Sequence, residues 1–402
     1  MELALSGVRV LDLTHYIAGP ACTKLLADFG ADVLKVERPD GDPCRRIGPF
    51  WHDEPHAEGS GLFLHLNTNK KSITLNLRSV AGQRIVKELA RDADLVIEAF
   101  KPGTMECLGL GYESLKQINP SLVYQSVSSY GQSGPYRDYK GTDMVLYGIG
   151  GPMATNSQYG MYPLRMPGVS AQIHAGYVAA VAALTGYFSS AYQGIGQYID
   201  TSVFDAHAGS VDRRLTLLLA YQYQGFPFPR SATRGSGFPQ GIYPCKDGYV
   251  NVWGGLQFFP LSAKMMGMPE LATDPHWCTR EAQLNQERRE EFETIFLPWI
   301  IEKTKAEFLE IARKSGILSG ALFTIEDLAN DRHFQEREFF AEATHPRAGS
   351  VAHVGPIVKM PESPATVRVT APLLGEHNEE VYCGRLGFSQ TEVAQMRRMG
   401  VV

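Results

Sequence analysis

The sequence lacks the short motifs that mark the common nucleotide-dependent enzymes. The turn after the first predicted strand reads THYIAGPAC, without the GxGxxG spacing that a dinucleotide pyrophosphate requires. No GxxxxGK(S/T) segment occurs, so a P-loop is missing as well. Both absences disfavour a nicotinamide-dependent dehydrogenase and a kinase.

Signatures of metal sites and serine hydrolases are also missing. The 11 histidines form no HExxH or HxH pair, and the six cysteines are scattered without a CxxC spacing. This pattern predicts no metal site, and it is typical of reduced thiols in a cytosolic protein. Asp205 and His207 lie near Ser202, but no GxSxG elbow accompanies them, so a Ser-His-Asp hydrolase has weak support.

Neither sign of charge is in large excess. The chain has 38 basic and 43 acidic residues, a net charge of −5, which disfavours general binding to nucleic acids or anionic membranes. The most apolar stretch, residues 173–191, is interrupted by polar side chains and predicts a buried helix rather than a membrane span. The N-terminus shows no signal-peptide pattern. We expect a cytoplasmic protein whose partners are small molecules or other proteins.

Strand and helix patterns alternate along the first half of the chain. The expected strands are residues 8–13, 32–37, 72–77, 94–100, 121–127 and 197–202, and the expected helices are residues 20–29, 81–93, 112–118 and 171–191. Repeated βαβ units predict an α/β fold with a mostly parallel sheet and helices on both faces. Further on, we expect a strand at 248–253, mainly helices over 258–345, short strands at 357–359 and 366–370, and a last helix at 391–399.

Two features are candidates for a ligand site. His15 lies in the turn after the first strand, where open parallel sheets bind ligands, but a histidine that only bonds the turn fits equally well. Gly235, Gly237 and Gly241 belong to a segment rich in glycine, proline and serine at residues 230–241. That segment is either a lid over a site or a linker into a second unit.

Long strings along the chain carry a resemblance to a known family. They are GVRVLDLTHYIAGPACTKLLADFGADVLKVERPDGD (7–42), LNTNKKSITLNL (66–77), FKPGTMECLGLGYESLKQINPSLVYQSVSSYGQSGP (100–135), GIGQYIDTSVFDA (194–206) and PLLGEHNEEV (372–381). In this order they resemble the class III CoA-transferases, a family that includes formyl-CoA and carnitine CoA-transferases. The resemblance covers nearly the whole chain.

The resemblance implies a fold and an assembly. It implies a Rossmann-like, CoA-binding large domain at residues 1–205 and 351–402, and a smaller inserted α+β domain at residues 225–329. Residues 206–224 and 330–350 would be linkers. Two such subunits interlock like links of a chain.

The resemblance also implies a reaction, in which CoA moves from an acyl-CoA donor to a carboxylate. An aspartate attacks the donor thioester, giving a mixed anhydride and then an aspartyl-CoA thioester, which the acceptor carboxylate attacks. Coenzyme A and its thioesters are substrates, and no tightly bound cofactor is expected. The residues implied to contact CoA are Arg38, Lys70, Lys71, Phe100, Lys101 and Met105, and those implied in the substrate loop are Gly235, Gly237 and Gln240.

The aspartate on which this reaction depends is missing. In the family it precedes a glycine by four residues, and in SAQIHAGYV that glycine is Gly176 and the aspartate position is Gln172. An amide is a poor nucleophile and cannot pass CoA on. No Asp or Glu lies between Asp143 and Asp200 to take over the role. Other departures near the implied site are Cys107 for an arginine, Ala99 for an asparagine and Ile17 for the glutamine of formyl-CoA transferases.

These departures predict the non-catalytic subunit of a heteromeric CoA-transferase, with a paralogous partner that supplies the aspartate. Two-subunit benzylsuccinate CoA-transferases have this composition, so succinyl-CoA is the expected donor and benzylsuccinate the expected acceptor. Two alternatives stay open, a self-sufficient transferase with another nucleophile and an acyl-CoA-binding protein without chemistry. The racemase branch of the family is discounted, because its G-H-D reads Gly141-Thr142-Asp143 here.

Overall fold

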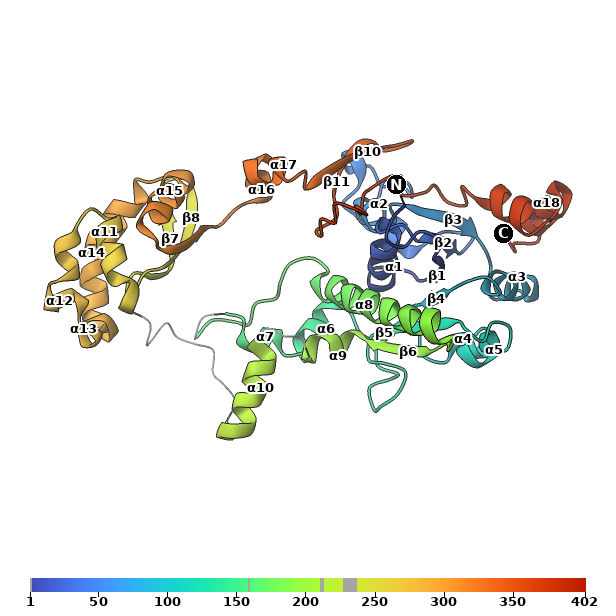
Figure 1. Cartoon of the computed structure of the whole chain (residues 1–402), viewed down its shortest axis with the longest axis horizontal. Coiled ribbons are helices and arrows are strands. Elements are labelled where there is room, and N and C mark those ends of the chain that lie inside the picture. Colours follow the sequence, from blue (N-terminus) through green and yellow to red (C-terminus); the bar gives the residue numbers. More distant parts are fainter. Residues whose placement is uncertain (1, 158–159, 210–212, 227–236) are drawn as a thin grey trace. The chain divides into compact units, whose positions relative to one another are not determined.

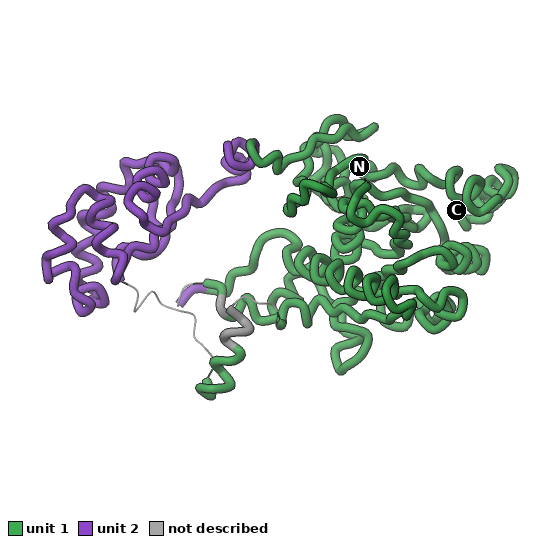
Figure 2. Tube along the Cα trace, viewed as in Figure 1, with its two compact units in different colours: residues 1–157, 162–229, 336–402 green, residues 158–161, 230–335 purple. Residues whose placement is uncertain are grey.

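The structure is a computed structural model, and it describes residues 2–157, 160–209, 213–226 and 237–402 (Figure 1). The strands are β1 (Arg9–Leu13), β2 (Asp32–Glu37), β3 (Lys70–Thr74), β4 (Leu95–Glu98), β5 (Val123–Ser128), β6 (Tyr198–Ser202), β7 (Gln240–Cys245), β8 (Gly248–Trp253), β9 (Leu318–Ala321), β10 (Phe340–His345) and β11 (Gly349–Val354). The chain divides into two compact units (Figure 2). Unit 1 comprises residues 1–157, 162–229 and 336–402, and unit 2 comprises residues 158–161 and 230–335.

Helices of unit 1 connect and cover its strands. They are α1 (Ala18–Asp28), α2 (Gly61–Leu66), α3 (Val80–Ala90), α4 (Thr104–Cys107), α5 (Tyr112–Lys116), α6 (Asp143–Ile149), α7 (Pro152–Thr155), α8 (Ser170–Gln193), α9 (Val203–Ala208), α10 (Arg213–Gln224) and α18 (Gln390–Arg398), with short turns η1 (Pro43–Arg46), η2 (Trp51–Asp53) and η5 (Glu380–Arg385). Within the described ranges, no helix is both long and apolar enough to cross a bilayer.

A parallel sheet forms the centre of unit 1. Its strand order is β3-β2-β1-β4-β5-β6, and every neighbouring pair is parallel. Val10 of β1 is paired with Val33 of β2 on one side and with Leu95 of β4 on the other. The apolar runs of these strands suit a sheet that is buried on both faces. The predicted α/β class and parallel sheet are therefore confirmed.

Successive residues of each strand point into two different hydrophobic cores, as the pleat requires. Leu11 and Val96 belong to a core closed by α3 and by the C-terminal residues, including Val401. Val10 and Ile97 belong to the opposite core, which α1 and α8 close. The sheet is thus the middle layer of three.

Helix α8 packs closely on α1 because small residues occupy the contact. Its buried positions are Ala171, Ala175, Gly176, Ala179, Ala180, Ala183 and Gly186. A Cβ on Gly176 would lie 2.5 Å from the carbonyl oxygen of Ala18. The helix ends at Gly194, whose φ of 69° suits glycine. This close packing fixes the first turn of α8 against the turn between β1 and α1.

Unit 2 is built on a small antiparallel sheet of order β7-β8-β9. Its helical elements are α11 (Phe259–Met265), α12 (Pro275–Cys278), α13 (Arg280–Leu284), α14 (Gln286–Ile301), α15 (Lys305–Ser315), α16 (Ile325–Asn330) and most of α17 (Arg332–Glu336), with short turns η3 (Leu256–Phe258) and η4 (Pro269–Ala272). Its core contains the buried rings of Phe238, Phe292 and Phe296. The domain limits expected from the sequence stay predictions.

Three expectations about elements need correction. Residues 357–359 and 366–370 are not strands; in the second segment, Thr366 donates its N–H to the Asp28 carbonyl and Val369 accepts the N–H of Asn69. Those bonds go to a helix end and a loop, so no ladder forms. The strand expected at 72–77 is β3 at Lys70–Thr74. The region 258–345 is mainly helical, as expected, and it also contains the short strands β9 and β10.

Candidate functional site

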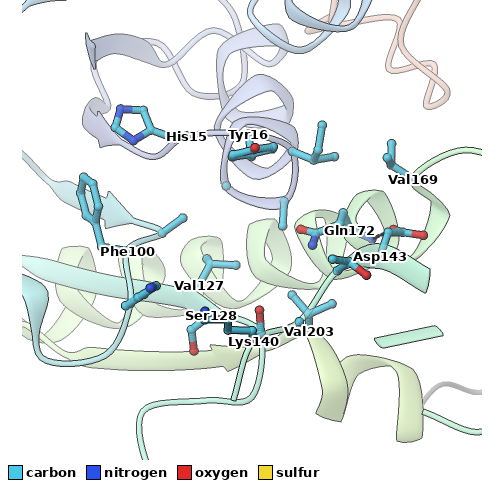
Figure 3. A pocket seen from close by; sticks show the side chains of 18 of the residues that line it. His15, Tyr16, Phe100, Val127, Ser128, Lys140, Asp143, Val169, Gln172 and Val203 are labelled. Atoms are coloured by element: carbon cyan, nitrogen blue, oxygen red, sulfur yellow. Dashed lines mark hydrogen bonds between the residues drawn. The ribbon is translucent and has the colours of Figure 1, made fainter. Parts of the chain in front are cut away.

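A cavity of about 680 Å³ lies where the strand order of the sheet reverses (Figure 3). Its lining includes residues 15–19 after β1, residues 99–102 after β4, and Ser128 and Ser129 at the end of β5. Crevices at the carboxyl ends of strands, at such a switch point, are the usual ligand sites of open parallel sheets. The volume is in the range of small-molecule sites.

A buried ionic network supports the turn that forms the first wall. Lys70 donates to Asp12 at 3.2 Å, to Thr23 at 2.8 Å and to Asn67 at 2.9 Å, and its side chain is fully buried. Burial lowers the pKa of Lys70 to about 8. Although burial opposes it, Lys70 and Lys35 hold the pKa of Asp12 well below its usual range. Lys70 therefore connects the edge strand β3 to β1 and α1, the two elements that flank the turn.

His15 and Phe100 come from different strands and meet at the cavity. Their ring centroids lie 5.3 Å apart in an edge-to-face arrangement. The N–H of Phe100 donates to Glu98 Oε2 at 2.7 Å, which fixes the backbone after β4. Burial lowers the pKa of His15 and raises the pKa of Glu98 to about 7. Both groups are therefore held toward their neutral forms.

Cations on two loops give the cavity an anion-attracting side. Lys101 follows β4, and Arg137 and Lys140 lie on the loop between β5 and α6. Lys101, Arg137 and Lys140 are exposed. Arginine and lysine side chains form charge-assisted hydrogen bonds with phosphates. Asp138 on the same loop also lines the cavity, but the three cations outweigh its charge, so this part of the lining is suited to a phosphorylated ligand.

Gln172 and Asp143 meet at another part of the lining. Gln172 lies in the first turn of α8, and its backbone N–H donates to Asp143 Oδ1 at 2.9 Å. Asp143 is the first residue of α6, and both side chains line the cavity (Figure 3). The cavity therefore presents an amide at the position that the sequence marks for a nucleophile, with a carboxylate beside its backbone.

Some residues that the resemblance implies for CoA lie away from this cavity. Phe100 and Lys101 are in its lining, whereas Arg38 is exposed and pairs with Asp40. The half-exposed Lys71 pairs with Glu380 at 2.9 Å. Met105 is buried in a hydrophobic core of the sheet. Their contacts with CoA stay predictions.

The residues expected in a substrate loop belong to unit 2. The carbonyl of Gly237 accepts a hydrogen bond from Arg289 Nη2 at 3.0 Å, and a Cβ at this position would lie 2.2 Å from Gln283 Oε1. Gln240 begins β7, and its N–H donates to Tyr243 Oη at 3.1 Å. Gly235 lies outside the described residues. Whether this segment contacts a substrate stays a prediction.

Sequence reasoning did not identify several residues of the lining. No sequence pattern marks Tyr16, Arg137 or Lys140 as lining residues, and Asp143 stands out in the sequence only as part of the racemase motif and as the end of an interval without carboxylates. No periodicity indicates that the loop at 136–143 joins the turn after β1, because this contact is tertiary. In the part of the chain that the structure describes, no group of three or more potential metal ligands occurs.

Comparisons with known proteins agree along the chain. The sequence model of CoA-transferase family III matches residues 5–378. A succinyl-CoA–D-citramalate CoA-transferase from Chloroflexus aurantiacus is 33% identical over 99% of this chain and 98% of its own length. A formyl-CoA:oxalate CoA-transferase from Streptomyces avermitilis is 34% identical over the full length of both chains. The crystal structure of a CaiB/BaiF family protein from Brucella suis is similar with a TM-score of 0.85, at 29% identity over 96% of this chain and 100% of that one.

Proposed function

Since the chain belongs to CoA-transferase family III, we propose that it serves in moving CoA from an acyl-CoA donor, such as succinyl-CoA, to a carboxylic acid. Its large domain, taken as Rossmann-like, would bind CoA in the cavity at the switch point. Lys101, Arg137 and Lys140 would contact phosphates, and the thioester would extend toward Gln172.

The observation that carries the rest of the proposal is Gln172 in the lining. A side-chain amide is not basic enough to attack a thioester and then carry an anhydride. Loss of a covalent nucleophile costs on the order of six decades of rate in a well-studied hydrolase. We therefore assign this chain the role of the non-catalytic subunit.

A paralogous partner would supply the carboxylate in an interlocked heteromer. The retained cavity and sheet support this role, because a subunit that interlocks with its partner must keep the whole fold. The scattered free cysteines support a cytoplasmic location. Benzylsuccinate is the acceptor that we propose to test first.

A self-sufficient transferase is the second candidate, and Asp143 is the observation that favours it. Its carboxylate lines the cavity within hydrogen-bond distance of the Gln172 backbone. A thioester carbonyl bound near Gln172 could be attacked by Asp143 instead. A protein that holds acyl-CoA without chemistry is the remaining alternative.

Native mass spectrometry and a CoA-transfer assay distinguish these roles. The chain is expressed alone and together with a paralogue encoded beside it, and each preparation is supplied with succinyl-CoA and benzylsuccinate. We expect transfer only in the mixed complex. Activity of the lone chain, with a CoA adduct on Asp143 located by peptide mapping, would contradict the non-catalytic role.

A further inference from the structure

Tyr16 has a backbone conformation that tyrosine rarely adopts. Its φ is +69°, in the left-handed region that favours glycine and asparagine. Its side chain is 52% exposed and belongs to the lining of the cavity (Figure 3). Strained residues persist where the surrounding structure holds them, and they gather at ligand sites.

A buried ion pair between Lys35 and Asp42 makes hydrogen bonds to the turn that contains Tyr16. Lys35 Nζ lies 2.9 Å from Asp42 Oδ2, and both side chains are fully buried. Lys35 also donates to the carbonyl of Thr14 at 2.9 Å, and Asp42 Oδ1 accepts the N–H of Tyr16 at 3.1 Å. The pair thus bonds the backbone on both sides of His15. Lys35 and Asp42 are positioning residues for Tyr16.

The wall beside Gln172 is apolar. Ile17, Leu62 and Val169 line the cavity and pack in one hydrophobic cluster. Val169 directly precedes α8 and lies three residues before Gln172, and both residues line the cavity. Ile17 follows Tyr16 directly. The cations of the cavity come instead from the loops after β4 and β5.

We propose that Tyr16, held in its left-handed turn by Lys35 and Asp42, selects the acid whose CoA thioester this cavity binds, and that this acid has a bulky apolar carbon skeleton with an aromatic ring. The inference rests on the proposed function, because it takes Gln172 to mark the position of the thioester carbonyl. An aromatic ring of the acid would pack on the Tyr16 ring and the apolar wall.

Calorimetric titration of the chain, or of its complex with the paralogue, tests the proposal with CoA, acetyl-CoA and phenylacetyl-CoA. We expect phenylacetyl-CoA to bind about tenfold more tightly than acetyl-CoA, as the loss of a ring contact implies. Tyr16→Ala and Tyr16→Gly should reduce this ratio to within about twofold. Tyr16→Phe should keep the ratio, as should Tyr223→Ala, a control at a residue that is 88% exposed.

The strained backbone gives a second readout, independent of the ring. Tyr16→Gly and Tyr16→Ala both remove the ring, but only glycine relieves the left-handed turn. The midpoint of thermal unfolding should therefore be about 2–4 °C higher for Tyr16→Gly than for Tyr16→Ala. Equal midpoints would contradict the strained turn.

The positioning role is tested by replacing the ion pair. Lys35→Met/Asp42→Leu substitutes apolar side chains, which buried pairs often tolerate, and should abolish the preference for phenylacetyl-CoA. Lys35→Arg retains the charge and should keep the preference. If the double variant folds and still prefers phenylacetyl-CoA, Lys35 and Asp42 do not position Tyr16. The Tyr16 variants would still test the role of the Tyr16 ring.

The outcomes separate the two proposals. Failure of CoA itself to bind would overturn the proposed function and this inference together. Binding of CoA with equal affinities for the two acyl-CoAs would overturn this inference alone, as would an unchanged ratio in Tyr16→Ala.

Discussion

Gln172 differs from a nucleophilic aspartate by an amide in place of the carboxylate and by one additional methylene, and the proposed non-catalytic role rests on the amide. The amide lies at the start of α8, with its backbone N–H bonded to Asp143. The cavity, its cations and its apolar wall are all present around it. If the proposed function holds, a carboxylate at this position is the smallest change that would supply the missing nucleophile.

We predict that Gln172→Asp gives the lone chain CoA-transfer activity. Removal of a covalent nucleophile lowers the rate about 10⁶-fold. If Gln172→Asp recovers only about one part in 10⁴ of that factor, the rate still rises by about 10²-fold. The measurements are the rate with succinyl-CoA and benzylsuccinate, and the intact mass for a CoA adduct. Gln172→Asn is the matched control. If Gln172→Asp binds CoA without any gain, the rest of the site cannot support the reaction.

Glu98 predicts a pH dependence of stability. Burial raises its pKa from 4.5 to about 7 in the folded protein. Between these values the folded state keeps a proton that the unfolded state has lost, so the free energy of unfolding falls as pH rises from 5 to 8. The loss is up to about 3 kcal/mol. The Glu98→Gln variant should not show this pH-dependent loss of stability, because an amide does not titrate. Its amide oxygen can still accept the hydrogen bond from the Phe100 N–H.

Urea unfolding of both proteins at pH 5 and pH 8 checks this difference. Parallel pH dependence of the parent and of Glu98→Gln would show that Glu98 is not the titrating group.

At the scale of elements, the contact between α1 and α8 connects the fold to the site. Gly176 lies one turn after Gln172 and allows the helices to touch. The same small-residue surface keeps the apolar wall at Val169 next to Ile17, and the two side chains belong to one cluster. A change in helix separation should therefore affect stability and ligand binding together.

We predict that Gly176→Ala destabilises the protein by about 1–2 kcal/mol. The new Cβ would lie 2.5 Å from Ala18 O and 2.7 Å from Ala21 Cβ, and this overpacking outweighs the gain in helix propensity. Gly384→Ala is the control, because a Cβ there meets no atom within 4 Å and the change should be near neutral. Denaturant midpoints measure both, and equal midpoints would contradict the close contact.

At the scale of the whole molecule, one long helix has both a buried and an exposed apolar face. Val181, Phe188 and Tyr192 of α8 are 67%, 62% and 77% exposed. They recur at helical spacing, and the rings of Phe188 and Tyr192 lie 4.3 Å apart. Exposed apolar stripes of this kind mark interaction surfaces. The proposed partner subunit is the occupant that we expect.

We predict that Phe188→Asp prevents the mixed complex from forming, because the carboxylate would be buried without a partner. Native mass spectrometry of the co-expressed chains should then show separate subunits. Val80→Asp is the control, since Val80 is 74% exposed on a different helix and the change should leave the complex intact. A complex of unchanged mass with Phe188→Asp would exclude this face as the contact.

The sequence by itself determined the class of the fold and most of its elements. A helix pattern separates the apolar runs at residues 8–13 and 32–37. This order predicts adjacent parallel strands, because a short βαβ connection favours that pairing. It also determined that Gln172 stands where the family has an aspartate. Such information is local in the chain, and it can be read without a structure.

Only the tertiary structure decided which residues share the cavity. The fold buries Lys70 against Asp12 and Asn67, and no local pattern distinguishes a buried lysine from an exposed one; its contact with CoA stays a prediction. Asp143 meets Gln172 across 29 residues of sequence, and Asp42 bonds Tyr16 across 26. These contacts depend on how the turn after β1, the loop before α6 and helix α8 pack together, which side-chain volume and backbone hydrogen bonding determine in three dimensions.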